Sequence, residues 1–138
     1  MANYYGKART SYMKVIDEEK FKAWAATIRD IDVITKKHEE YGMLYGLVFV
    51  GEFGGIVTSQ YNEETDKEED VEFYDEVQMH IAEGWSLIVM ETGSEKMRYL
   101  FGYAAVITPE DIRTIEINNW AEYMMQDLGG PHHTKAQY

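Results

Sequence analysis

The most concentrated chemistry in this chain is a run of carboxylates, here called the acidic block, between residues 63 and 76. Nine of its fourteen residues are acidic and Lys67 is its only base, so it carries −8 of the chain's net charge of −12. Carboxylates at this density can bind a metal ion, perform acid–base chemistry or attract a basic surface. The acidic residues are Glu63, Glu64, Asp66, Glu68, Glu69, Asp70, Glu72, Asp75 and Glu76.

The sequence argues against the first of these chemistries, metal binding. Asp66, Glu68 and Asp70 alternate as in a calcium-binding loop, but that loop requires glycine at its sixth position and glutamate at its twelfth. This chain has Val71 and Val77 there. It has no cysteine, and its four histidines lack the paired helical spacing of a zinc site. We therefore predict no metal and no cofactor.

Catalytic signatures are equally sparse. Glu52 and Glu91 are flanked by apolar residues, which would raise the pKa of a buried carboxyl group and suit it to acid–base work. The glycines of residues 51–55 lead into another apolar run rather than a helix, so they predict a turn and not a phosphate-binding loop. We expect the protein not to be an enzyme, with a small carboxylate-based enzyme as an alternative.

Aromatic and basic residues interleave near the N-terminus, a pattern that can bind single-stranded nucleic acid. The strongly acidic chain lacks the basic footprint of a nucleic-acid-binding domain, so we expect no direct contact with nucleic acid. We expect the tyrosines to line one face of the first strand and the cations the other. The residues are Tyr4, Tyr5, Lys7, Arg9, Tyr12 and Lys14.

The elements that position these residues predict an α+β fold. Apolar residues recur at helical spacing after Asp17, a good N-cap, and again over residues 74–82 and after Asn118 or Asn119. Alternating or apolar runs predict strands over residues 8–16, 31–36, 42–50, 85–92, 97–108 and 113–117, with a further apolar run at 56–59. Gly93 and Ser94 are expected to form the turn of a hairpin between residues 85–92 and 97–108. We expect a mainly antiparallel sheet with two to three helices packed on one face, in a single domain over residues 1–130, and a flexible tail over 131–138. The apolar runs are too short to cross a membrane.

The acidic block is expected to be a loop in its first half and to enter the second helix in its second half. Tyr61, Phe73 and Tyr74 punctuate it, and aromatic residues beside charge are typical anchors of protein interfaces. Carboxylates packed along a loop and a helix can also imitate the charge density of duplex DNA. We therefore predict that the acidic block and these three aromatic residues bind a protein partner with a basic surface.

Three segments, GKARTSYMKV at 6–15, DEEKFKAW at 17–24 and SEKMRYLFGYAAVI at 94–107, resemble a group of small acidic proteins encoded on phages and plasmids. The resemblance implies a mobile-element setting, in which such proteins block CRISPR effectors or restriction enzymes in the host cytoplasm. Together with the charge of the acidic block, it leads us to expect a non-enzymatic inhibitor that mimics nucleic acid, and a homodimer is possible. The alternative is an intracellular adaptor or assembly protein whose acidic block only keeps it in solution.

Overall fold

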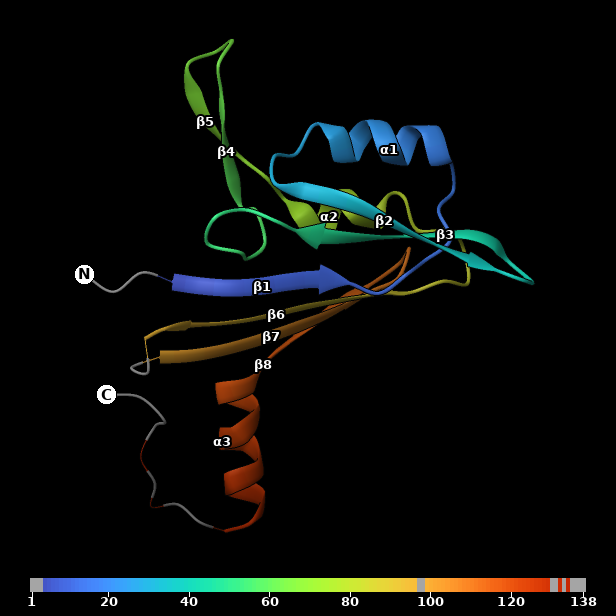
Figure 1. Ribbon diagram of the computed structural model, residues 1–138. Helices are drawn as coiled ribbons and strands as arrows, with labels where there is room; N and C mark the ends of the chain where they lie inside the picture. The colour runs from blue at the N-terminus through green and yellow to red at the C-terminus, as the bar shows by residue number, and fades with distance from the viewer. Residues whose placement is uncertain (1–3, 97–98, 130–131, 133, 135–138) are drawn as a thin grey trace.

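The computed structural model describes residues 4–96, 99–129, 132 and 134, and it is built around a six-stranded antiparallel sheet (Figure 1). The strand order is β2–β3–β1–β6–β7–β8. The strands are β1 (Tyr4–Thr10), β2 (Ile31–His38), β3 (Gly42–Phe49), β6 (Leu87–Glu95), β7 (Tyr99–Ile107) and β8 (Ile112–Glu116). A separate two-stranded sheet pairs β4 (Ser59–Asn62) with β5 (Lys67–Asp70). The predicted α+β class and antiparallel sheet are confirmed.

Two helices cover one face of the large sheet, which we call the inner face. Helix α1 (Glu18–Ala26) begins where predicted, because Asp17 accepts a hydrogen bond from the Lys20 amide at 3.1 Å. Its Phe21 side chain is fully buried, as is Val77 of helix α2 (Phe73–Gln78). These two helices pack against inner-face strand residues, and together they form the core.

Alternation along β6 and β7 separates this inner face from the opposite one, the outer face. On β6, Leu87 and Val89 are buried while Ile88 and Met90 are exposed, and neighbouring β7 repeats the pattern. Helix α3 (Ile117–Asp127) does not join the helices on the inner face but extends away from the β8 edge (Figure 1). None of its residues is buried. Much apolar surface on this side of the molecule is therefore left uncovered.

The structure differs from the prediction at several element boundaries. Strand β1 starts and ends earlier than expected, residues 56–58 form no strand, and β6 runs through Gly93 instead of turning there. The cap of α3 is Glu116, whose carboxylate accepts hydrogen bonds from the amides of Asn118 and Asn119. The predicted tail over 131–138 lies largely outside the described residues.

The largest difference concerns the first half of the acidic block, which is a hairpin and not a loop. Asn62 holds its turn by accepting a hydrogen bond from the Glu64 amide at 2.9 Å, and Asp66 adopts the left-handed conformation that tight turns require (φ 55°). Side chains also bridge the strands, since Asn62 donates to Glu69 and Ser59 to Glu68. Local polar contacts thus replace the apolar alternation that normally marks a strand.

Candidate functional site

The β4–β5 hairpin, residues 59–70, projects from the body of the molecule beside α1, and we call it the acidic hairpin (Figure 1). Every residue of β5 is exposed, and so are the turn residues 63–66. The strand presents three carboxylates in succession, with three more in the turn. They are Glu68, Glu69 and Asp70 on the strand and Glu63, Glu64 and Asp66 in the turn. Together with Tyr61, the structure thus gathers seven of the twelve predicted site residues on one projecting element.

Polar contacts with the end of α1 orient this hairpin. The Gln60 side chain donates to the Thr27 carbonyl at 2.8 Å and accepts from the Arg29 amide at 3.0 Å. Arg29 also lies 3.6 Å from Glu63, in an exposed ion pair of the kind that contributes at most about 1 kcal/mol. Within the described part of the chain this is the acidic block's one ion pair, so most of its charge is uncompensated.

The second half of the acidic block has a different role. Glu72 and Asp75 are exposed, but Glu76 is half-buried and its carboxylate accepts hydrogen bonds from the Glu72 amide at 2.9 Å and from the Trp24 indole at 3.1 Å. Glu76 therefore closes the first turn of α2 and fastens it to α1. Its carboxylate already has two partners within the fold, and its role in partner binding stays a prediction.

The three predicted aromatic anchors differ in how exposed their side chains are. Phe73 is only 4% exposed, and its ring lies 5.0 Å from that of Phe49 in the core. Its prediction as a contact residue is wrong, because the face of α2 that carries Phe73 and Val77 is the one turned to the sheet. Tyr61 is exposed on the acidic hairpin, whereas Tyr74 is half-buried. Tyr61 is thus the anchor that stands beside the exposed carboxylates.

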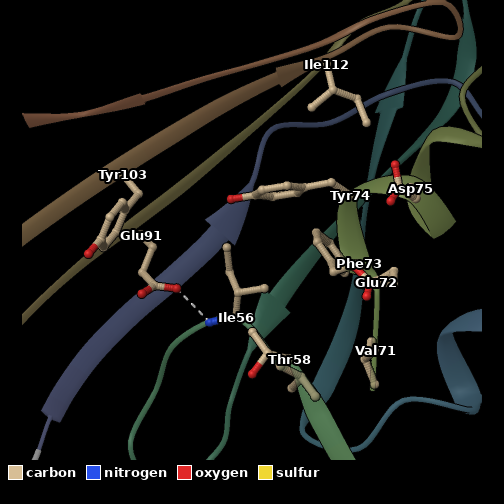
Figure 2. A pocket seen from close by; sticks show the side chains of 11 residues that line it. Ile56, Thr58, Val71, Glu72, Phe73, Tyr74, Asp75, Glu91, Tyr103 and Ile112 are labelled. Carbon is tan, nitrogen blue, oxygen red and sulfur yellow. Dashed lines mark hydrogen bonds between the residues drawn. The ribbon is translucent and has the colours of Figure 1, made fainter. Parts of the chain in front are cut away.

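A cavity of about 630 Å³ lies at the base of the acidic hairpin, between α2 and the inner face (Figure 2). Glu91 of β6 forms part of its wall, and its two carboxylate oxygens accept hydrogen bonds from the Tyr4 hydroxyl at 2.6 Å and from the Ile56 amide at 2.8 Å. Tyr74 and Tyr103 face the same space (Figure 2). The other lining residues are mostly apolar, so the cavity combines one negative charge with an apolar wall.

Glycines make room for the Tyr4–Glu91 hydrogen bond. The Tyr4 ring lies across Gly93 of the neighbouring strand, and a methyl group at Gly93 would meet ring atoms at 2.3 Å. Gly6 is nearly as crowded, with Tyr4 atoms at 2.7 Å from the equivalent position. Sequence reasoning placed Gly93 in a turn and therefore missed that it admits this ring.

The negative charge of Glu91 contributes to raising the pKa of the three tyrosines around it. Burial raises the pKa of Tyr74, and the negative charge of Glu91 raises it further. Burial also raises the pKa of Tyr103, together with the charges of Glu116 and Glu91. Burial and the hydrogen bond to Glu91 raise the pKa of Tyr4 strongly. All three phenols consequently stay protonated to a higher pH than an exposed tyrosine does.

Of the two carboxylates predicted to be partly buried, Glu91 is half-buried and Glu52 is exposed. No lysine or arginine in the described ranges forms an ion pair with Glu91. Its oxygens are held instead by two neutral donors, which keep the carboxylate in a fixed position. Glu52 and Glu91 do not form a buried pair of carboxylates, because Glu52 is exposed.

The expectation for the first strand is also corrected. Tyr5, Lys7 and Arg9 share the outer face of β1, while Tyr4 points to the inner face. Tyrosines and cations are thus mixed on one side, since alternation in a strand groups residues two apart. Arg9 and Lys36 each lie within 6 Å of the Tyr12 ring centre, at 5.8 and 5.9 Å.

No group of three or more potential ligands among the described residues is placed to hold a metal ion. Within the same residues, no helix has the length and apolar character needed to span a membrane. Comparisons with known protein families, with curated proteins and with solved structures gave no match to this chain.

Proposed function

We propose that this protein is a non-enzymatic inhibitor from a mobile element, and that its acidic hairpin occupies a basic, nucleic-acid-binding surface of a host defence nuclease complex. The observation that carries the proposal is a projecting hairpin whose carboxylates are exposed and almost free of cations. A basic channel of a CRISPR effector or a restriction enzyme in the host cytoplasm has the complementary charge. Tyr61 supplies an aromatic contact beside these charges.

The spacing of the carboxylates supports the mimicry of nucleic acid. Successive residues of a strand rise by about 3.3 Å along its axis, so Glu68, Glu69 and Asp70 place one charge at each such axial step, with Glu69 on the opposite face from the other two. A single DNA strand carries one phosphate per roughly 3.4 Å of helix axis. Charge of this kind mainly accelerates association, whereas aromatic contacts slow dissociation.

A plating assay tests this function. Isogenic bacterial strains that carry a restriction system or a CRISPR effector would express the chain and be challenged with a targeted phage. We expect the chain to raise plating efficiency in at least one strain, and neutralisation of the hairpin by Glu64→Gln, Glu68→Gln, Glu69→Gln and Asp70→Asn to reduce the gain by about tenfold or more. The partner itself would then be identified in that strain.

The matched control changes the net charge by the same amount at exposed acids outside the acidic hairpin. It combines Glu39→Gln, Glu40→Gln, Glu83→Gln and Glu110→Gln, and it should retain the protection. Equal protection by the two variants would contradict a role for the hairpin. Absence of protection in every strain would contradict the inhibitor function.

The apolar surface of α3 favours a second candidate function, an adaptor or assembly protein. In that case the acidic block would only keep the protein in solution, and contacts would run through α3. Binding to such a partner would persist at high salt, because burial of apolar surface is not screened by ions.

A further inference from the structure

Helix α3 and its C-cap residue Leu128 carry a row of large apolar side chains that are 49% to 87% exposed. Its links to the body lie in the first turn, where Ile117 covers Gly102 and the Asn118 amide donates to the Leu100 carbonyl at 3.2 Å. An isolated helix of this length is marginally stable in water, and most helices in proteins depend on packing of their apolar face. The uncovered residues are Ile117, Trp120, Tyr123, Met124 and Leu128.

The outer face contains a hollow of about 670 Å³ over β1 and β6. Its apolar lining includes Tyr5, Phe53 and Met90, and the Tyr5 and Phe53 rings lie 5.8 Å apart. Lys7 and Arg9 also line it, and neither belongs to an ion pair of the described residues, while Glu52 stands at the loop side. The hollow therefore combines aromatic side chains with the two cations of β1.

The charge of α3 complements that hollow. The helix contains no basic residue, and Asp127 lies on the same side as Trp120 and Tyr123. The C-terminal end of a helix also carries a partial negative charge. The apolar side of α3 ends in negative charge, and it is therefore complementary to the apolar hollow that Lys7 and Arg9 also line.

We propose that α3 of each copy docks into the hollow over β1 and β6 of a second copy, so that the protein is a symmetric dimer. One twofold axis satisfies both contacts at once, because each copy donates a helix and offers a hollow. This contact leaves the acidic hairpin outside the interface and goes beyond the proposed inhibitor function.

The available area is sufficient for a stable dimer. Eight large apolar residues of α3, its C-cap and the hollow are between 48% and 87% exposed. They offer on the order of 1,000 Å² of apolar surface per copy, whereas a stable interface covers about 800 Å² per partner. The residues are Ile117, Trp120, Tyr123 and Met124 of α3, its C-cap Leu128, and Tyr5, Phe53 and Met90 of the hollow.

Molar mass by light scattering after size-exclusion chromatography tests the dimer with two matched variants. Met124→Glu places a charge on the apolar side of α3, and Gln126→Glu adds the same charge on the opposite side. We expect the wild-type chain and Gln126→Glu to have the dimer mass at micromolar concentration, and Met124→Glu to shift the dissociation constant upward by at least tenfold. A monomeric wild type, or a dimer equally stable in both variants, would overturn the proposal.

A cross-linking experiment identifies which copy supplies the helix. The chain has no cysteine, so Met90→Cys and Met124→Cys each introduce a unique thiol. A short bis-maleimide should link the two single variants to each other when they are mixed, giving a covalent dimer. In the double variant, a link confined to one chain would show that α3 folds back onto its own outer face, and would overturn the exchange between copies.

Discussion

The carboxylates of the acidic hairpin and that of Glu91 are the same chemical group in opposite surroundings. On the hairpin they are exposed and mutually repulsive, and their partners are surface contacts: Arg29 for Glu63, Ser59 for Glu68 and Asn62 for Glu69. Glu91 is half-buried, with one hydrogen bond to each oxygen from residues 87 and 35 positions away. The hairpin carboxylates are therefore available to an external partner, whereas the fold already uses Glu91.

Removal of the Glu91 carboxylate should have the largest effect on stability. Glu91→Ala would leave the Tyr4 hydroxyl and the Ile56 amide without their acceptor, and we expect a loss of about 2–4 kcal/mol in the free energy of unfolding. Urea denaturation followed by circular dichroism measures it. Glu91→Gln retains one carbonyl acceptor and should lose less. A loss below about 0.5 kcal/mol for Glu91→Ala would show that these hydrogen bonds do not stabilise the fold.

A methyl group at Gly93 should have the next largest effect, since it would overlap the Tyr4 ring. We expect Gly93→Ala to reduce the free energy of unfolding by about 1–3 kcal/mol. The same substitution in a Tyr4→Ala background should cost much less, because the ring is then absent. Equal costs in the two backgrounds, measured in a double-mutant cycle, would contradict the contact.

Alkaline pH should produce a smaller loss of stability centred on the same region. The raised pKa of Tyr4, Tyr74 and Tyr103 means that the unfolded chain releases phenol protons before the folded chain does. Stability is therefore full below pH 10 and declines as the pH rises above it. Denaturation from pH 8 to 11 checks this decline, and Glu91→Gln should shift the Tyr74 titration downward because it removes the negative charge. An unchanged Tyr74 titration in that variant would contradict the influence of Glu91.

Neutralisation of the acidic hairpin should have the smallest effect on stability. The four substitutions used in the plating assay remove exposed, largely unpaired charges, so we expect a change within about 0.5 kcal/mol. The same denaturation measurement checks it. A loss as large as that of Glu91→Ala would mean that the hairpin carboxylates stabilise the fold, and the comparison between the two regions would fail.

Local patterns predicted much of the fold. The cap at Asp17 and the helical spacing after it located α1, and apolar alternation located β2, β3 and most of β6 and β7. The acidic hairpin was missed because its strands contain residues that rarely form strands and lack apolar alternation. Its position depends on Gln60, whose contacts with Thr27 and Arg29 cross more than thirty residues.

The candidate site was predicted in part for the same reason. Charge counting located the hairpin carboxylates, and apolar flanks marked Glu91 as a buried candidate. Burial of Phe73 and the bond of Glu76 to Trp24 depend on which side of α2 meets the sheet and α1. The pairing of Tyr4 with Glu91 requires β1 and β6 to be neighbours, and no local pattern establishes that register.

The free edge of β5 has a consequence for the behaviour of the chain in a crowded cell. A two-stranded hairpin that projects into solvent offers unpaired backbone groups on which other extended chains can add a strand. All four residues of β5 are charged, and three of them are negative. A strand that paired with β5 would have to bury these charges, and an acidic strand would be repelled by them. The residues proposed to attract a basic partner therefore also protect the hairpin from aggregation.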